Sequence, residues 1–412
     1  MKERTQVNLI QAKTLKRVLL LTLFIAAMLF SISGHAVAQE DGKHHVLILN
    51  SYHQGFSWTN RVVAGINEAF AEADSTAEFH IEYMDTKRLF NEDYLQDIFQ
   101  LLRGKYATIP IDLIILSDNN ALEFMRTYGE QLFPDIPIVF TGINNYDDAL
   151  LEGFDQITGV AEATDIASTL SLMLTLHPET NQIYVINDQT PTGVATLNEF
   201  DRVKTDYEDQ VQFIVYDDFQ INEMQQELAT LPSDSLILML LVNRDNTGQF
   251  YTYEESLDIL SLYTEVPIYG VWDFYIEHGI VGGKLTDGFA QGQNAGEMAL
   301  RILQGDTTPD IPILRESPNQ YMFDFEQLER FGIDQSQLPE GSLIFNRQPS
   351  FYELYKTYIW TALSVIITLV VIVIFLLINI RQRRRAEEDL NQSFVRRGRQ
   401  VELSTHVAQD IV

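Results

Sequence analysis

The sequence contains no cysteine. Disulfides, zinc–thiolate sites, cysteine nucleophiles and lipid attachment through a lipobox cysteine are therefore excluded. Basic residues are also scarce, with 28 Lys and Arg against 58 Asp and Glu and a formal net charge of −30. The electrostatic field of so negative a protein repels nucleic acids and anionic lipid surfaces. The composition predicts a domain held together by its core alone, with no nucleic-acid partner.

Two long apolar runs divide the chain. The first, Val18–Phe30, follows a basic segment and precedes the small-residue sequence Ala36-Val37-Ala38. A basic start, a short apolar stretch and a small-x-small site are typical of an export signal. We expect residues 1–38 to be a signal peptide that is cleaved after Ala38, with an N-terminal membrane anchor as the alternative.

The second run, Tyr358–Ile380, is free of charge and is followed by Arg381, Arg383, Arg384 and Arg385. It exceeds the roughly 20 residues that a helix needs to span a hydrocarbon core of about 30 Å. Arginines flanking a membrane helix mark its cytoplasmic side. The sequence therefore predicts an extracytoplasmic domain at residues 39–357, a transmembrane helix at 358–380 and a cytoplasmic segment at 381–412. After signal cleavage the protein would cross the cell membrane once.

Short apolar runs alternate with amphipathic stretches from His45 onward. Strands are predicted for His45–Asn50, Phe79–Tyr83, Leu113–Leu116, Ile136–Phe140, Ile183–Ile186, Val211–Val215, Leu236–Leu241 and Pro267–Tyr269. Helices are predicted for Thr59–Ala73, Tyr94–Leu102, Ala121–Tyr128, Ala167–Leu176, Gly193–Tyr207, Ile221–Leu231 and Asn294–Leu303. Buried strands separated by helices indicate parallel sheets covered on both faces. We expect an α/β fold of two Rossmann-like lobes, crossing first near Thr141–Asp148 and again after Asn243 and within Tyr269–Tyr275.

Polar and aromatic residues gather where the predicted strands end. In open α/β sheets, ligands bind beyond the carboxyl ends of the strands. The sequence therefore predicts a small-molecule cleft lined by Tyr52, Trp58, Asp118, Asn119, Asn144, Asn243, Trp272 and Asp273. Two alternatives stay open: Asp118, Asn119 and Asn187 could simply cap helices, and the aromatic residues could form a core between the lobes.

Several patterns fail to support catalysis or metal binding. The glycine-rich stretch Gly279–Thr286 lacks the phosphate-loop spacing and predicts a tight turn. His44 and His45 are adjacent, so in a strand their side chains point to opposite faces, and no third ligand is apparent. No carboxylate pair stands out from the acidic surface, and nothing indicates a Ser-His-Asp arrangement. We expect no catalytic residue, cofactor or metal.

A series of motifs extends along residues 45–357: Ile48-Leu-Asn-Ser-Tyr-His53, Glu82-Tyr-Met-Asp-Thr-Lys-Arg88, Ser117-Asp-Asn-Asn120, Pro137-Ile-Val-Phe-Thr-Gly-Ile-Asn-Asn145, Tyr269-Gly-Val-Trp-Asp-Phe-Tyr275 and Ser317-Pro-Asn-Gln-Tyr-Met-Phe-Asp324. With these motifs the segment resembles the ABC-transporter substrate-binding-protein-like sensor domains, which have the type I periplasmic-binding-protein fold and are fused to histidine kinases and diguanylate cyclases. The resemblance implies a two-lobed domain that binds a small ligand outside the cell.

The segment after the second apolar run carries a resemblance of its own. Arg384–Leu390 is similar to the signalling helix of such receptors, and Arg396–Val412 to the lead-in helix of a GAF domain. An apolar stripe could pair two copies as a parallel dimer: Ala386, Leu390, Val401, Leu403 and Val407. The alternative is an amphipathic tail without a partner. We expect the output domain to be missing from this chain, which stops where a GAF domain would begin.

These observations favour a two-component-type sensor that transmits ligand binding through its transmembrane helix as a homodimer. A membrane-tethered solute-binding protein of an ABC importer is the main alternative, and an external enzyme is a weaker one.

Overall fold

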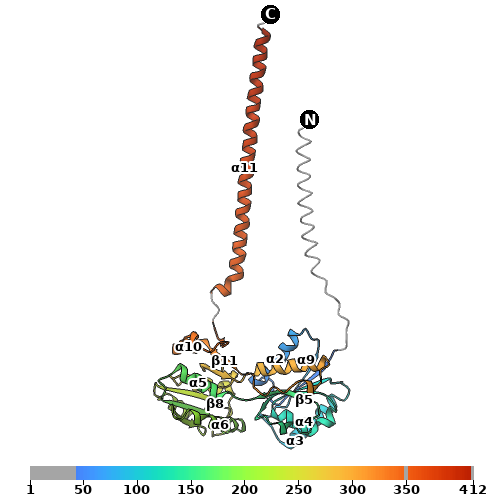
Figure 1. The fold of residues 1–412 in the computed structure, drawn as a ribbon, viewed down its shortest axis with the longest axis vertical. Helices are drawn as coiled ribbons and strands as arrows, with labels where there is room; N and C mark the ends of the chain where they lie inside the picture. Colours follow the sequence, from blue (N-terminus) through green and yellow to red (C-terminus); the bar gives the residue numbers. More distant parts are fainter. Residues whose placement is uncertain (1–42, 348–350, 410–412) are drawn as a thin grey trace.

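A computed structural model describes residues 43–347 and 351–409. Two α/β lobes lie side by side, and one long helix, α11, rises from the side of the second lobe (Figure 1). The predicted signal peptide lies outside the described residues, so its cleavage stays a prediction.

Lobe 1 is built on a five-stranded parallel sheet with the order β2-β1-β3-β4-β5. Its strands are β1 (His45–Asn50), β2 (Glu78–Tyr83), β3 (Leu113–Ser117), β4 (Ile138–Asn144) and β5 (Ile157–Glu162). Its helices are α2 (Ser57–Glu72), α3 (Glu92–Lys105), α4 (Asn119–Leu132) and α9 (Gly288–Leu303), with the short 3-10 helices η1 (Asp148–Leu151) and η4 (Thr308–Asp310).

Alternate residues of each central strand of lobe 1 face opposite layers, as strand geometry requires. In β1, Val46 and Ile48 belong to the core on the α2 and α9 side, whereas Leu47 and Leu49 pack with α3 and α4. All four side chains are fully buried. The prediction of a parallel sheet covered on both faces is confirmed.

Lobe 2 has a seven-stranded sheet with the order β12-β11-β10-β9-β8-β6-β7, in which only the β10–β11 pairing is antiparallel. Its strands are β6 (Gln182–Asn187), β7 (Gln212–Tyr216), β8 (Ser235–Leu241), β9 (Ile268–Gly270), β10 (Gly282–Leu285), β11 (Gln320–Asp324) and β12 (Leu343–Phe345). Its helices are α5 (Ile166–Leu176), α6 (Pro191–Val203), α7 (Ile221–Leu228), α8 (Tyr253–Ser261) and α10 (Phe325–Phe331), with the 3-10 helices η2 (Lys204–Asp206), η3 (Asp273–Tyr275) and η5 (Gln335–Gln337).

The chain crosses between the lobes at positions other than those predicted. The first crossing, at residues 163–165, joins β5 to α5; the second, at 286–287, joins β10 to α9; the third, at 315–319, leads to β11. The predicted crossing at Thr141–Asp148 is wrong, because β4 continues to Asn144 and pairs with β5 inside lobe 1. The predicted crossings after Asn243 and within Tyr269–Tyr275 are also wrong, since both segments stay in lobe 2.

Four strands were not predicted from the sequence: β5, β10, β11 and β12. The stretch predicted as a tight turn contains β10, whose Gly282 and Gly283 are buried between β9 and β11. A Cβ on Gly283 would lie 2.3 Å from the carbonyl oxygen of Gly270. Glycine here permits close approach of backbones rather than a turn.

Helices α2 and α9 lie against each other on lobe 1 (Figure 1). A Cβ on Gly65 would stand 2.0 Å from the carbonyl oxygen of Phe289, and one on Gly292 would stand 2.0 Å from that of Val62. The two helices therefore touch backbone to backbone. Gln291 of α9 extends this attachment, because its buried side chain bonds to Thr141 and to the carbonyl oxygen of Ala161.

Replacing Gly292 by alanine is expected to destabilise the fold by about 1–3 kcal/mol, because the added methyl group forces α2 and α9 apart. Gly104→Ala in α3 is the matched control: nothing lies within 4 Å of its Cβ position, and alanine favours helix by up to about 1 kcal/mol. Urea unfolding of both variants measures the difference. Equal stability of the two variants would contradict the close contact.

Helix α11 extends from Phe351 to Gln409. Within it, Phe351–Leu390 contains a window long and apolar enough to cross a membrane, and none of that window is buried against the protein. Among the described residues it is the one candidate span. It includes the predicted segment Tyr358–Ile380.

Candidate functional site

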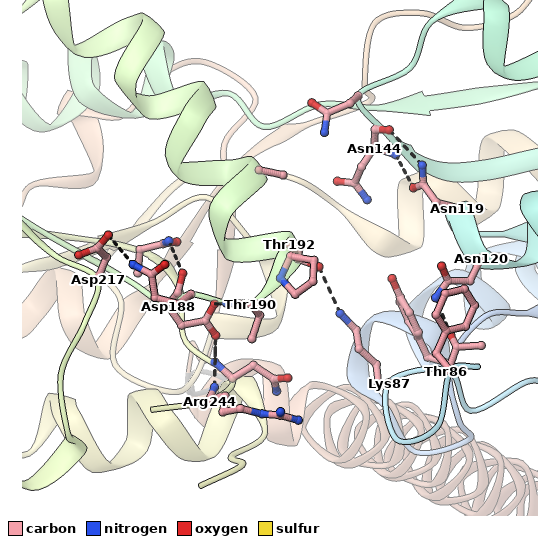
Figure 2. A pocket seen from close by; sticks show the side chains of 18 of the residues that line it. Thr86, Lys87, Asn119, Asn120, Asn144, Asp188, Thr190, Thr192, Asp217 and Arg244 are labelled. Atoms are coloured by element: carbon pink, nitrogen blue, oxygen red, sulfur yellow. Dashed lines mark hydrogen bonds between the residues drawn. The ribbon is translucent and has the colours of Figure 1, made fainter. Parts of the chain in front are cut away.

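A cavity of about 740 Å³ lies between the lobes at the carboxyl ends of the strands. Figure 2 shows that Lys87, Asn119, Asn120 and Asn144 come from lobe 1 and that Asp188, Thr190 and Arg244 face them from lobe 2. A smaller, inner cavity continues it and is lined by Tyr52, Phe56, Trp58, Lys87, Asp118, Asn144, Glu162, Thr192, Leu241, Tyr253, Trp272 and Phe274. Of the eight residues predicted for the cleft, seven line one or both cavities, and Asp273 lines neither.

Asp118 sits at the end of β3 in a rare backbone conformation, with φ 71° and ψ 163°. Such a conformation costs a non-glycine residue about 1–3 kcal/mol and is concentrated at functional sites. It aims the carboxylate into the protein, where Oδ1 accepts from Trp58 Nε1 at 2.9 Å and Oδ2 accepts from Ser117 Oγ at 2.6 Å. The Asp118 side chain makes no capping bond to α4, so the helix-cap alternative is wrong for this residue.

Glu162 ends β5 and is buried, yet its Oε2 has no hydrogen-bond partner among the described residues. The carboxylates of Asp118 and Glu162 face the same space, since a Cβ on Gly142 would lie 3.3 Å from Asp118 Oδ1 and 3.5 Å from Glu162 Oε2. Burial and the charge of Asp118 raise the pKa of Glu162 well above its ordinary value. Burial likewise raises the pKa of Asp118 to about 7. The expectation that no carboxylate pair stands out is therefore wrong.

Lys87 supplies the positive charge next to these carboxylates. Its Nζ lies 4.6 Å from the ring centre of Tyr52 and 6.0 Å from that of Tyr253, in the range of cation–π contacts. It also donates across the cleft to Thr192 Oγ1 at 3.4 Å (Figure 2). A second bond of 3.4 Å reaches the hydroxyl of Tyr253. Burial lowers the pKa of Lys87, and the charge of Asp118 counteracts this effect.

Asp188 of lobe 2 has a different role, because its oxygens are already occupied. Oδ1 accepts from the backbone and hydroxyl of Thr190, and Oδ2 accepts from the backbone N–H groups of Asn243 and Arg244 at 2.6 and 3.2 Å. Asp188 therefore fixes the loops after β6 and β8, whereas Glu162 keeps a buried oxygen, Oε2, that has no partner among the described residues.

The predicted amides help to shape the cleft wall. The Asn119 side chain accepts from the backbone N–H of Asn144 and donates to its carbonyl oxygen, at 3.0 and 3.2 Å. Asn243 Nδ2 donates to the carbonyl oxygen of Tyr251 at 2.6 Å. Asn187, beside the cleft, donates to the carbonyl oxygens of Asp188 and Gly193. These amides hold strand ends and loops in place around the cavity.

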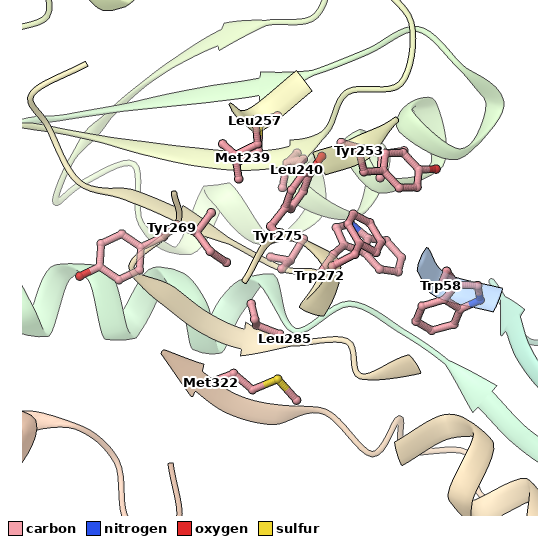
Figure 3. Packing of buried hydrophobic residues seen from close by; sticks show 14 of the residues in the cluster. Trp58, Met239, Leu240, Tyr253, Leu257, Tyr269, Trp272, Tyr275, Leu285 and Met322 are labelled. Carbon is pink, nitrogen blue, oxygen red and sulfur yellow. The ribbon is translucent and has the colours of Figure 1, made fainter. Parts of the chain in front are cut away.

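The aromatic residues combine the two roles that the sequence left open. Trp58 from α2 meets Trp272 of lobe 2 edge to face, with ring centres 6.0 Å apart (Figure 3). Both side chains are buried core and both line the inner cavity. The indole Nε1 of Trp272 has no partner within the described chain. Among the residues that line the inner cavity, the buried Nε1 of Trp272 is a hydrogen-bond donor without a partner, and the buried Oε2 of Glu162 is an acceptor without one.

Asp273 belongs to a contact between the lobes. The Arg61 guanidinium of α2 reaches Asp273 Oδ2 and, at 3.3 Å, Oδ1 of Asp287 in the second crossing. Asp273 also accepts from the backbone N–H of Gly288 at 2.8 Å. Burial alone would lower the pKa of Arg61, but the two carboxylates raise it. This cluster ties the lobes together beside the cavity.

Three residues important to the cavity were missed in the sequence. Lys87 lies beyond the carboxyl end of β2, a predicted strand whose following residues were not considered. Glu162 ends β5, a strand that was not predicted. Asp188 directly follows Asn187 at the end of β6 but was not selected. In each case the position at the carboxyl end of a strand was the available indication of a site residue.

Comparison with known families decides the classification. The family model described as ABC transporter substrate binding protein matches residues 59–339. The chain belongs to this family. The sequence matches none of the curated proteins with which it was compared.

Solved structures share the fold of this substrate-binding protein family member at low sequence identity. The ligand-free, open structure of CD0873, a substrate binding protein with adhesive properties from Clostridium difficile, is 15% identical, with a TM-score of 0.53, covering 74% of this chain and 100% of that one. An ABC domain from Streptococcus pneumoniae in complex with L-Trp is 16% identical, with a TM-score of 0.52 and coverages of 74% and 100%. A conserved domain protein from Vibrio cholerae is 14% identical, with a TM-score of 0.50 and coverages of 73% and 100%.

The family assignment confirms the predicted two-lobed fold and the coarse function of the domain. Residues 45–347 form a substrate-binding-protein-like domain for a small ligand, followed by a helix that is a candidate membrane span. The cavity between the lobes combines apolar walls with a few polar groups, as sites for small ligands do.

Proposed function

We propose that this protein is an extracytoplasmic sensor in which a small, positively charged ligand binds between the lobes and α11 transmits the binding to a cytoplasmic output. The observation that carries the proposal is the continuity of α11. After β12 of lobe 2, the helix runs through an apolar segment and its arginines and on to Gln409 without a break. A rigid helix attached to one moving lobe is a direct route for a signal.

The charge of the ligand follows from the inner cavity. Asp118 and Glu162 are both buried there, and Lys87 is the one basic side chain among the described residues that line it. A buried carboxylate without a partner is costly, and a cationic group that binds it removes that cost. An ammonium group placed between Glu162 and the aromatic walls would pair with the carboxylate and make cation–π contacts with the rings.

The form of the output is proposed from the sequence. The resemblance of Arg384–Leu390 to signalling helices and of Arg396–Val412 to a GAF lead-in supports a histidine kinase or diguanylate cyclase downstream, acting as a homodimer. The arginines after the apolar run support a cytoplasmic location for this end.

An importer role is the second candidate. It is favoured by the family itself, whose description is that of an ABC transporter substrate-binding protein. In that role α11 would serve as a tether, and ligand binding between the lobes would not need to change its arrangement.

Disulfide crosslinking in α11 separates the two roles. The chain has no cysteine, so any disulfide must form at a cysteine that is introduced. We place single cysteines at Ala386 and Leu390, which share a helix face, to measure how closely two copies of α11 approach each other. We expect dimers to form faster at these positions than at the Glu388→Cys control on the opposite face, and the rates to change when ligand is added. Equal crosslinking rates at all three positions, with and without ligand, would contradict the proposed sensor role.

A panel of related ligands tests the predicted charge. L-Tryptophan, which the Streptococcus pneumoniae domain binds, is compared with its decarboxylated amine and with its deaminated acid. The ammonium-bearing compounds are expected to bind about 10–100-fold more tightly than the acid, the range for hydrogen bonds to charged groups. Glu162→Gln should remove this preference, whereas Asp217→Asn at the rim should keep it. Preferential binding of the acid would overturn the predicted charge.

A further inference from the structure

A cluster of imidazole and carboxylate groups lies at the start of the first two strands, away from the ligand cavity. His45 is the first residue of β1 and pairs with Glu78, the first residue of β2, while Leu47 pairs with His80. Paired residues of neighbouring parallel strands point to the same face, and so do residues two apart in one strand. The side chains of His45, Glu78 and His80 therefore converge on one face of the sheet.

Their distances match what a transition metal needs. His45 Nδ1 lies 3.0 Å from His80 Nε2, and one ligand atom from each of the three residues lies within 4.8 Å of the others. Two nitrogens bound to a tetrahedral zinc ion at about 2.0–2.1 Å stand about 3.3 Å apart. A shift of a few tenths of an ångström would thus place both imidazoles on one ion.

We propose that His45, Glu78 and His80 bind a divalent transition metal of the zinc class. Two imidazole nitrogens and one carboxylate oxygen suit zinc, and also copper and nickel, better than calcium or magnesium. The Glu78 side chain is exposed and has no hydrogen-bond partner among the described residues, so it is available to a metal. Water can complete the coordination because the site is open on one side.

The contact of His80 with Tyr106 holds the His80 imidazole ring in place. The buried ring of Tyr106 meets His80 edge to face, with centres 5.7 Å apart, and the Tyr106 hydroxyl donates to Glu82 at 2.5 Å. A ring held in place loses less freedom when it binds a metal. Because β2 is the edge strand of this sheet and, within residues 43–347, pairs with β1 alone, the ion would clamp this edge of lobe 1.

The neighbouring His44 is outside the cluster and provides a matched control. His44 and His45 do not act as a pair, since adjacent residues of an extended chain face opposite sides. The Nδ1 atom of His44 lies instead 3.8 Å from Oδ2 of Asp112. No third ligand was apparent in the sequence because Glu78 and His80 lie on another strand and reach His45 only through the pairing of β1 with β2.

The test uses the full chain in detergent, stripped of metal with a chelator. Zinc is titrated in competition with a chromophoric chelator, and thermal unfolding is followed with and without zinc. The wild type is expected to bind one zinc per chain and to melt at a higher temperature when it does. Glu78→Gln and His80→Asn should each weaken binding at least about tenfold and abolish the thermal shift, whereas His44→Ala should change neither.

Glu78 is exposed, so Glu78→Gln keeps the test valid even if His80→Asn unfolds. Zinc affinity within twofold of wild type in Glu78→Gln would overturn the proposal and leave His45 and His80 as a hydrogen-bonded pair only. An equal loss in His44→Ala would also overturn it. Cobalt binding with the visible absorption of a tetrahedral site, lost in Glu78→Gln, would support it independently.

Discussion

Replacing Arg61 by methionine is expected to lower the free energy of unfolding by about 3 kcal/mol, the low end of the range for removing one partner from a buried ion pair, because the Arg61 side chain is 34% exposed. The guanidinium contacts Asp273 and Asp287, which are 3% exposed each. Burial raises the pKa of Asp273, and the charge of Arg61 counteracts this rise. Without Arg61, both carboxylates must stay buried without a countercharge or take up protons.

Urea unfolding of Arg61→Met measures this effect, with Arg126→Met as the control for a surface pair with Glu123. The control is expected to cost less than about 1 kcal/mol. Adding Asp273→Asn to Arg61→Met should recover part of the loss, because it removes one of the two unpaired charges. A loss below about 1 kcal/mol in Arg61→Met, with no recovery in the double variant, would show that the cluster does not hold the lobes together.

The ligand-free protein is expected to lose stability as the pH rises from about 4.5 to 8, and Asp118 is a main cause. Its pKa is raised by burial from 3.8 to about 7. The folded state therefore keeps a proton that the unfolded chain releases above pH 4, so stability falls across this window and stops falling above about pH 7. A carboxyl group with this shift contributes about 3 kcal/mol of the loss.

Asp118→Asn isolates that contribution, because an amide can still accept from Trp58 but does not ionise. The difference in unfolding free energy between the variant and the wild type should become more favourable to the variant by about 3 kcal/mol between pH 4.5 and 8. Parallel stability curves for Asp118→Asn and the wild type would mean that Asp118 ionises normally in the folded protein.

Much of lobe 1 and the centre of lobe 2 could be predicted from the sequence because their strands are continuous apolar runs. β1 was predicted with its observed ends, and β3, β6 and β8 within a residue or two. The strand β5 was missed since Thr158 and Gly159 interrupt its apolar character. This omission moved the predicted first crossing into β4 and also concealed Glu162.

The site was predictable where a residue follows a recognisable strand, as Asp118 and Asn144 do. The contact of Arg61 with Asp273 could not be found in this way, because it joins residues 212 positions apart through the packing of α2 beside the second crossing. Buried charges look identical in sequence to the many acidic residues of the surface. Only the three-dimensional neighbours of Glu162 distinguish it from them.

The path of the chain also limits the order in which the domain can fold. Helix α9 covers lobe 1 but is encoded after β10 of lobe 2. During synthesis, the α2 face that contains Gly65 therefore stays uncovered until about residue 303 has emerged, and most of lobe 2 is made in the meantime. Contacts between such distant segments slow folding and prolong the exposure of apolar surface. A shortened chain that ends before Gly288 should consequently aggregate instead of yielding a stable lobe 1.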